Sequence, residues 1–249
     1  MGNANTTIRP EEAEFFSDLA RDWWNPKGKM ASLHEVNPVR LQFLRDAIDA
    51  HWPDAARLAK PLAGKSARDI GCGAGLRCEP MARRGGDVTG VDAAAQNVSV
   101  AAAHAEAVGL DIRYMAGEVA SLDIGTFDLV TSVEVVEHVA DKRAFIADVA
   151  ARLAPPKDGK EGGLLVMSTP NRTAASRVLL VGAAEAIGYV PKGTHHWRDF
   201  ITPPELEELL NAVGLEVTTR RGIAYRPGKG LHLSDDESIN YILCARHAS

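Results

Sequence analysis

From about residue 61 to the C-terminus, short apolar runs alternate with segments in which apolar residues recur every three or four positions. The runs predict buried strands, and the periodic segments predict amphipathic helices. We expect strands at 67–70, 87–91, 112–115, 127–133, 163–168, 216–220 and 241–245, and helices at 76–84, 97–108, 142–153 and 204–212. Strands alternating with helices of about 10 to 15 residues predict a parallel sheet with helices on both faces. The last two strands have no long helix between them, which predicts an antiparallel edge.

Before residue 61, the apolar positions follow a helical period only. Pro10 and the two acidic residues after it suit the first turn of a helix, and Asn37-Pro38 is expected to open a second helix. The apolar residues at helical spacing are Phe15, Phe16, Leu19 and Trp23, then Leu41, Leu44 and Ile48. We therefore predict a helical N-terminal extension over residues 1–60 that covers the functional site, followed by one α/β domain over residues 61–249. Within this domain, residues 171–200 are too long for a simple connection and predict an inserted lid or surface helix.

A glycine-rich loop follows the first predicted strand and precedes a helix. It reads Asp69-Ile70-Gly71-Cys72-Gly73-Ala74-Gly75. Glycines let the backbone turn sharply and approach a ligand where a Cβ would collide. About 20 residues further on, Asp92 closes the next strand, where a carboxylate can accept hydrogen bonds from both ribose hydroxyls of a nucleoside.

The spacing of these glycines distinguishes between cofactors. A dinucleotide site reads G-x-G-x-x-G and faces a pyrophosphate, whereas this loop reads G-x-G-x-G after an acidic residue. That pattern suits a cofactor with a cationic amino-acid tail and no phosphate. We therefore expect S-adenosylmethionine, bound on a Rossmann-like sheet of the class I methyltransferase type.

Charge and cysteine content narrow the partners and the compartment. A formal net charge of -5 offers no footprint for a phosphate backbone, so no nucleic acid partner is expected. The three cysteines match neither a disulfide framework nor a zinc site, which indicates reduced thiols in the cytoplasm. The longest apolar stretch, residues 178–190, contains an acidic residue and is shorter than the roughly 20 residues that span a bilayer.

Four groups of residues resemble the ubiquinone-biosynthesis O-methyltransferases, a family of class I methyltransferases. The first group is Trp23-Trp24, Pro26, Leu33-His34 and Asn37-Pro38-Val39-Arg40-Leu41, and the second is the glycine loop with Val88-Thr89-Gly90-Val91-Asp92. The third group is Glu134-Val135-Val136-Glu137-His138-Val139. The fourth is Ser168-Thr169-Pro170-Asn171-Arg172-Thr173 with Val190-Pro191-Lys192-Gly193-Thr194-His195 and Phe200-Ile201, and Asn240-Tyr241 adds a C-terminal match. The glycine loop and Asp92 are shared by the superfamily. The tryptophan pair, the Asn-Pro-Val-Arg run and the Val-Pro-Lys-Gly-Thr-His run are more specific.

The resemblance implies two O-methylations of polyprenylated phenols or catechols on the way to ubiquinone, with other ubiquinone-biosynthesis proteins as possible partners. It implies that Arg40, Gly71, Asp92 and Val133 contact the cofactor, and Gly73 lies in the same loop. Arg40 can pair with the cofactor carboxylate. From its position alone, however, a solvated arginine on a helix face is favoured, and only the resemblance reverses that preference.

Glu134, Glu137 and His138 follow the strand at 127–133, at the edge where open α/β sheets bind ligands. A phenol of pKa about 10 must lose its proton before it attacks a methyl group. If the turn is helical, the three side chains share one face and can chelate a divalent ion that holds both catechol oxygens. The resemblance points to magnesium, although an imidazole ligand leaves manganese or zinc open.

The alternative interpretation is structural. The two glutamates can favour the positive end of a helix while the histidine packs locally, and geometry alone favours this reading. With the resemblance added, we predict Glu134, Glu137 and His138 as catalytic and metal-ligating residues. His195 and His196 are left out of the catalytic set, because paired surface histidines are common.

A polyprenyl substrate implies contact with a membrane surface. The inserted segment carries an apolar patch with basic residues near its ends: Val178, Leu179, Leu180, Val181, Ile187 and Val190, with Arg172, Arg177 and Lys192. Such a segment can lie in the interface of an anionic membrane, although a helix packed on the core is the simpler reading. We expect a cytoplasmic protein bound weakly to the inner face of the membrane.

Two other functions stay open. The chain can methylate another small phenol, amine or carboxylate, or it can bind the cofactor without turnover as a regulatory or scaffold protein.

Two residues differ from the expected pattern. Arg68 stands where an apolar strand residue is expected, which predicts a distorted or partly exposed first strand. Ala120 stands where relatives often carry an acid for the adenine amine, for which Glu118 is the possible substitute.

Overall fold

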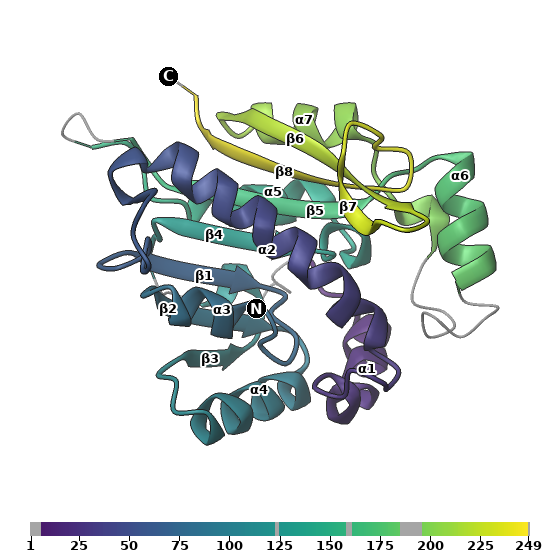
Figure 1. Cartoon of the computed structure of the whole chain (residues 1–249), viewed down its shortest axis with the longest axis horizontal. Helices are drawn as coiled ribbons and strands as arrows, with labels where there is room; N and C mark the ends of the chain where they lie inside the picture. Colours follow the sequence, from purple (N-terminus) through teal and green to yellow (C-terminus); the bar gives the residue numbers. More distant parts are fainter. Residues whose placement is uncertain (1–5, 123–124, 158–160, 185–195, 249) are drawn as a thin grey trace, which may run out of the picture.

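The computed structural model describes residues 6–122, 125–157, 161–184 and 196–248, and its centre is one mixed sheet (Figure 1). The strand order is β3-β2-β1-β4-β5-β8-β6-β7. The strands are β1 (Ser66–Ile70), β2 (Asp87–Asp92), β3 (Arg113–Ala116), β4 (Leu129–Val133), β5 (Leu164–Pro170), β6 (Leu215–Arg226), β7 (Gly230–Ser234) and β8 (Asn240–His247). Strands β1 to β5 pair in parallel, and β8, β6 and β7 pair antiparallel at one edge. The predicted class I methyltransferase fold is therefore confirmed.

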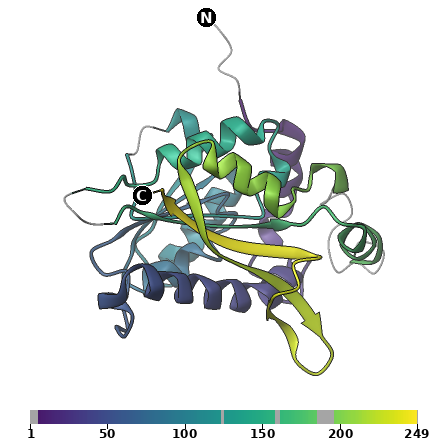
Figure 2. The same cartoon turned by 90° about the horizontal axis from the view of Figure 1, so that it is seen from above.

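Helices cover both faces of this sheet (Figure 2). They are α1 (Pro10–Asp18), α2 (Ala31–His51), α3 (Cys78–Arg83), α4 (Ala95–Ala107), α5 (Lys142–Ala151), α6 (Ala174–Ser176) and α7 (Pro203–Asn211), with short 3-10 helices η1 (Ala20–Asp22), η2 (Pro53–Ala55), η3 (Val119–Ser121), η4 (Val136–His138) and η6 (Trp197–Asp199) and the π-helix η5 (Arg177–Ala184). Leu165 and Met167 of β5 face α5 and α7 in one core, whereas Leu164 and Val166 face α2 in the other. Strands buried on both faces read as continuous apolar runs.

Helix α2 begins earlier than the sequence predicts. It starts at Ala31, so Pro38 lies inside it rather than at its start. A proline inside a helix removes one backbone hydrogen bond. The helix continues because its apolar side is buried against the sheet, with Phe43, Leu44 and Ile48 in the same core as β1, β5 and β8.

The C-terminal edge also differs from the prediction. Strand β6 extends to Arg226, beyond the expected end at residue 220, and pairs with β7 in a hairpin that the sequence pattern missed. Every residue of β7 is half-buried, so no alternation of buried and exposed positions marks it. Strand β7 lies against α2.

The predicted distortion of the first strand is wrong. Arg68 is fully buried, yet β1 keeps regular pairing with both β2 and β4. The strand tolerates the residue because the long side chain reaches along the core to the Phe127 ring, 5.4 Å from the guanidinium carbon.

The inserted segment is partly described. Thr173 caps α6, which continues into η5 as far as Ala184. Ile187, Val190, Lys192 and His195 lie outside the described residues. In the part of the chain that the structure describes, no helix is long and apolar enough to cross a membrane.

Candidate active site

A cavity of about 310 Å³ opens at the carboxyl ends of β1, β2 and β4. Its wall combines the glycine loop, the residues after β2 and β4, and residues of the N-terminal extension. Four of the five predicted cofactor contacts, Arg40, Gly71, Asp92 and Val133, line it, as do Glu134 and His138, whereas the predicted residues Gly73 and Glu137 are not among its lining residues. The fold thus gathers these predicted residues around one space.

The glycine loop has the backbone that the sequence predicts. Gly71 and Gly73 have φ of 69° and 53°, in the left-handed region that favours glycine. A Cβ at Gly71 would overlap the Val135 side chain, and a Cβ at Gly73 would overlap the Trp23 ring. The Gly73 N–H donates to Asp92 Oδ2 over 2.8 Å, so this glycine supports the carboxylate that faces the cavity.

Asp92 is held by its backbone neighbours and by a side chain. Its Oδ1 accepts from the Ala94 N–H at 2.9 Å and from Asn97 Nδ2 at 3.2 Å. Burial raises the pKa of Asp92, and the hydrogen bonds from Ala94 and Gly73 oppose the rise. These contacts use three of the four acceptor positions of the carboxylate, so one position on Oδ2 stays open for a ribose hydroxyl.

Asp69 does not face the cavity. Its oxygens accept from Thr131 Oγ1 at 2.7 Å and from Arg77 Nε at 3.2 Å. Arg77 also donates to the Gly71 carbonyl at 2.8 Å. The position of Asp69 before the glycines suggested that it faces a cationic tail of the cofactor. In the structure, Asp69 is buried away from the cavity and fixes the loop through Arg77.

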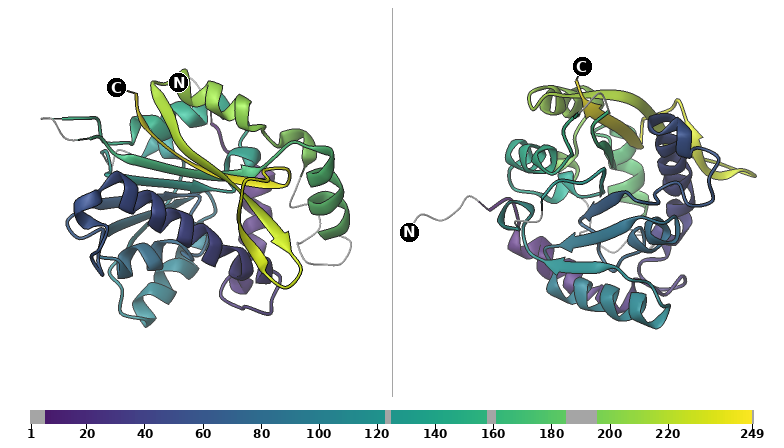
Figure 3. Two further views of the ribbon diagram at one scale, coloured as in Figure 1. Left: turned by 45° about the horizontal axis from the view of Figure 1, so that its top comes forward. Right: turned by 90° about the vertical axis from the view of Figure 1, so that its left-hand side faces the viewer.

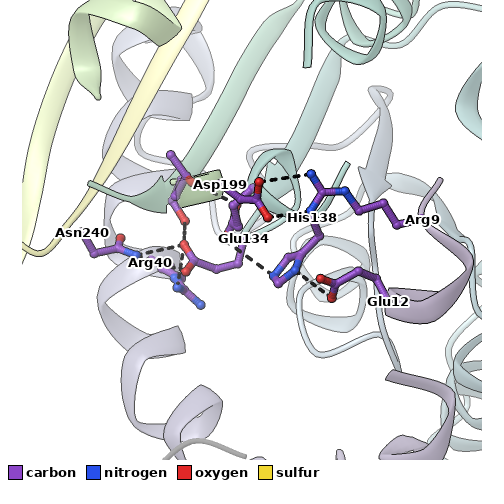
Figure 4. Close-up of polar contacts among 10 residues, drawn as sticks. Arg9, Glu12, Arg40, Glu134, His138, Asp199 and Asn240 are labelled. Carbon is purple, nitrogen blue, oxygen red and sulfur yellow. Dashed lines mark hydrogen bonds and ion pairs between the residues drawn. The ribbon is translucent and has the colours of Figure 1, made fainter. Parts of the chain in front are cut away.

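Arg40 projects from α2 toward Glu134 (Figure 4). Its Nη2 lies 3.0 Å from Glu134 Oε1, while its Nε and Nη1 are buried with no hydrogen-bond partner among the described residues. Burial lowers the pKa of Arg40, and the charge of Glu134 opposes that shift. Two unpartnered donors of a buried guanidinium at the cavity wall fit a carboxylate ligand.

Glu134 is the only non-glycine residue with positive φ, 56°, in the described part of the chain. Ser168 Oγ donates to its Oε1 at 2.7 Å, and Asn240 Nδ2 lies 3.1 Å from both oxygens. Strained backbone of this kind persists where surrounding contacts fix it and is concentrated at functional sites.

Glu137 and His138 belong to the 3-10 helix η4. Glu137 is buried and accepts from Thr169 Oγ1 at 2.9 Å. Burial, with the charge of Glu134, raises the pKa of Glu137 to about 7. His138 Nδ1 lies 3.1 Å from Glu12 Oε2, and its Nε2 lies 3.9 Å from Glu137 Oε1.

Two opposed effects act on His138. Burial lowers its pKa, but the hydrogen bond to Glu12 and the charge of Glu137 outweigh burial and raise it above the ordinary histidine value. The ring is thereby fixed between two acidic side chains from different elements. Glu12 comes from α1, and the sequence pattern gave no reason to single it out beyond its place in a first helical turn.

The predicted helical face of Glu134, Glu137 and His138 is wrong. Glu134 precedes η4 with a left-handed backbone and turns its carboxylate to Arg40 and Asn240, whereas His138 points to Glu12 (Figure 4). Within the described ranges, no group of three or more His, Cys, Asp or Glu residues is arranged to hold a metal ion. The three residues in this arrangement do not fit the predicted ion.

The other residues that the sequence singled out differ in whether they line the cavity. Glu118 lines the cavity and accepts from Thr7 Oγ1 at 2.8 Å, whereas Ala120 is exposed. His196 is exposed, and His195 is not among the described residues. Thr7 and Asn240 also line the cavity, although the sequence pattern did not single out Thr7 and the resemblance gave Asn240 only as a C-terminal match.

Comparison with known proteins agrees with the fold. Residues 42–220 match the family model described as a methyltransferase domain. Magnesium protoporphyrin IX methyltransferase from Synechocystis, solved with bound SAH, shares the fold with a TM-score of 0.62 at 18% identity, over 95% of this chain and 100% of that one. The YcgJ protein from Bacillus subtilis has a TM-score of 0.54 at 16% identity, over 82% of this chain and 99% of that one.

The fold, the glycine loop and Asp92 define a class I S-adenosylmethionine-dependent methyltransferase. Two curated relatives carry the name ubiquinone biosynthesis O-methyltransferase. The one from Azorhizobium caulinodans is 43% identical over 98% of this chain and 96% of its own length, and the one from Nitrobacter winogradskyi is 44% identical over 96% and 91%. The chain belongs to the ubiquinone biosynthesis O-methyltransferase family.

Proposed function

We propose that the protein methylates hydroxyl groups of polyprenylated phenols and catechols, in both O-methylation steps that lead to ubiquinone. The observation that carries the proposal is one cavity lined by two chemically distinct groups of residues. Arg40 and Asp92 are a polar group that suits the cofactor, while Leu180, Ile223 and Leu231, from three separate elements, are an apolar group. His138 lines the same cavity, so a base is within the space that both ligands would share.

The polar group and its neighbours have separate roles in binding the cofactor. Asp92 accepts from the ribose hydroxyls, Arg40 donates to the amino-acid carboxylate with its unpartnered Nε and Nη1, and Val133 offers apolar surface beside the adenine. Gly71 lines the cavity, and its positive φ lets the backbone turn there. When bound, the cofactor supplies a methyl group that its sulfonium has already activated.

His138 is proposed as the general base. With Nδ1–H donating to Glu12, Nε2 is the ring nitrogen that takes the phenol proton. Glu137 lies beside Nε2 and stabilises the imidazolium that results. Glu134 holds Arg40 and Asn240 in place at the cavity wall. The remaining work is alignment of the acceptor oxygen with the methyl group.

Magnesium stays a prediction of the sequence pattern and of the resemblance. Among the described residues, Glu134, Glu137 and His138 are not arranged as a group that could hold a metal ion, so no step proposed above passes through one. Activity measured after treatment with a chelator tests this directly. A requirement for added Mg²⁺ that Glu137→Ala or His138→Ala abolishes would restore the metal-ligating reading.

We also propose weak peripheral binding to the inner face of an anionic membrane, through the inserted segment. Val178 and Leu179 of η5 are exposed, and Arg177 lies next to them. Deletion of residues 173–190 should reduce sedimentation with anionic vesicles. Contact with other ubiquinone-biosynthesis proteins stays a prediction.

The function is tested by measuring S-adenosylhomocysteine formation with demethylated quinone precursors and, in parallel, with unrelated phenols, amines and carboxylates. The proposal expects the highest kcat/KM for the polyprenylated phenols. A higher kcat/KM for an unrelated acceptor would favour another small-molecule methyltransferase. Binding of S-adenosylhomocysteine without turnover of any acceptor would favour a regulatory or scaffold protein.

A further inference from the structure

We propose that the β6–β7 hairpin is a second membrane-docking element, which acts with η5 to place the apolar group of cavity residues at an anionic lipid surface. The inference rests on the proposed function, because it concerns how a substrate with a hydrocarbon tail reaches the site. It adds an element that the sequence pattern did not reveal. It also identifies the partner by its chemistry, an anionic phospholipid bilayer.

The cavity itself connects the two docking elements. Leu180 comes from η5, Ile223 from β6 and Leu231 from β7, and all three line the cavity that also holds Arg40 and Asp92. An acceptor ring beside His138 would therefore direct its tail between η5 and the hairpin. A bilayer that contacts both elements would meet the tail where it leaves the protein.

Exposed apolar side chains gather on these same two elements. In the described part of the chain, five large hydrophobic side chains are exposed, and three of them are Val178 (65%), Leu179 (49%) and Tyr225 (70%). The hairpin and η5 project from the same side of the molecule, at the right in Figure 1 and in the left view of Figure 3. Exposed apolar side chains around the mouth of a cavity indicate an interaction surface.

The charge of the hairpin tip selects an anionic membrane as the occupant. The tip reads Tyr225-Arg226-Pro227-Gly228-Lys229, all five residues exposed. No acidic residue occurs between Ala224 and Ser234, and the nearest acid along the chain, Asp235, follows the end of β7 and pairs with Arg221 at 3.4 Å. A tyrosine suits the headgroup region, where its ring is half-buried and its hydroxyl stays wet. Flanking basic residues add attraction to anionic lipids.

The chain offers a matched control for this tip. The control site is likewise one exposed hydrophobic residue with two exposed basic ones, Leu58 with Arg57 and Lys60. It lies in the loop before β1, at the amino end of that parallel strand. The experiment compares Tyr225→Ser/Arg226→Ser/Lys229→Ser with Arg57→Ser/Leu58→Ser/Lys60→Ser. Both are sedimented with vesicles of phosphatidylglycerol and phosphatidylcholine, and with vesicles of phosphatidylcholine alone.

We expect the hairpin variant to lose about tenfold in partitioning to the anionic vesicles, because two basic residues and an interfacial aromatic ring are removed. The control variant should bind as the unaltered protein does. With a catechol that lacks a tail, kcat/KM of the hairpin variant should be unchanged; with a polyprenylated acceptor held in anionic vesicles, it should fall with the partitioning. If the triple substitution prevents folding, Arg226→Ser/Lys229→Ser keeps Tyr225 and tests the charge alone.

Undiminished vesicle binding by a folded hairpin variant, or an equal loss in both triple variants, would overturn the inference. The first result would leave η5 as the sole docking element, and the second would indicate a general effect of charge. If no phenol is methylated at all, the proposed function fails, while the sedimentation result still decides the role of the hairpin.

Discussion

The chemistry of the site depends on single residues whose environments oppose their ordinary behaviour. His138 is buried, yet its pKa is raised, because Glu12 and Glu137 lie on two sides of the ring. Arg68 is buried, yet its guanidinium has no hydrogen-bond partner among the described residues. The raised pKa of His138 fits a role in the reaction, whereas the unpaired guanidinium of Arg68 lowers the stability of the fold.

For the base, we predict that the acidic limb of the pH profile of kcat/KM shifts to lower pH in Glu12→Gln. A raised pKa keeps His138 protonated until higher pH, so the rate rises only as that pKa is passed. Removing the Glu12 charge and its hydrogen bond lowers the pKa of His138, so the acidic limb moves to lower pH. Glu14→Gln, an exposed glutamate on the same helix, should leave the profile unchanged. His138→Asn should lower kcat by about a hundredfold or more.

An unshifted limb in Glu12→Gln, together with full activity of His138→Asn, would remove His138 as the base. Glu137, whose pKa is about 7, would then be the next group to test.

For the buried arginine, we predict that Arg68→Met stabilises the protein. Burial lowers the pKa of Arg68 to about 10, and Arg152 adds to that shift, so the folded state carries an unpaired charge in an apolar core. Methionine fills a similar volume without this cost, and such replacements are worth about 1 kcal/mol or more. Thermal unfolding of Arg68→Met should give a higher Tm. A Tm lowered by several degrees would mean that the Phe127 contact outweighs the desolvation of the charge.

At the scale of elements, the N-terminal extension fixes the cofactor loop from outside the sheet. The Trp24 Nε1–H donates to the Ala74 carbonyl at 2.9 Å, and the Trp24 ring stacks on His104 of α4 with centroids 3.5 Å apart. Trp23 occupies the space above Gly73. The two adjacent tryptophans therefore hold the loop from the side of α1 and α4.

We predict that Trp24→Phe weakens binding of S-adenosylhomocysteine about fivefold to tenfold, because it removes one hydrogen bond to the loop while keeping an aromatic ring. Calorimetry measures this Kd. Trp52→Phe is the control, because the Trp52 ring lies 4.2 Å from the Lys65 ammonium, next to the amino end of β1 and away from the glycine loop. Equal Kd values for Trp24→Phe and the unaltered protein would show that the loop keeps its shape without this contact.

For the whole molecule, the cavity depends on contacts between distant parts of the chain. Arg9 pairs with both oxygens of Asp199, at 2.6 and 3.2 Å, and the Thr7 carbonyl accepts from Ala140 N–H at 2.9 Å. These contacts draw the segment before α1 across the cavity. Glu12, Phe16 and Trp23 then line it from above the sheet.

We therefore predict that S-adenosylhomocysteine slows amide hydrogen exchange in α1, because a ligand that contacts this helix stabilises its closed position. Helix α7 packs against α5 in the core. Its amide exchange should slow only as far as the ligand stabilises the whole protein. Identical exchange in α1 with and without the ligand would contradict a covering role of the extension.

Much of the fold could be read from the chain. Strand β5 begins with the apolar run Leu164 to Met167 and is buried throughout, so its pattern is strong, and the glycine spacing predicted a loop whose Gly71 lines the cavity. Strand β7 has no such pattern, because it is half-buried throughout. Pro38 predicted a helix start that burial of Phe43 and Ile48 against the sheet overrode.

The sequence by itself determined the sheet, the glycine turn and the carboxylate at Asp92, because strand period and backbone freedom are local properties. Only the tertiary structure decided the direction of side chains around the site. Glu134 turns to Arg40 because its backbone is left-handed and Ser168 and Asn240 hold it there, and His138 meets Glu12 across 126 residues of chain. Such contacts join groups far apart in sequence, so their geometry follows from packing and cannot be read from spacing.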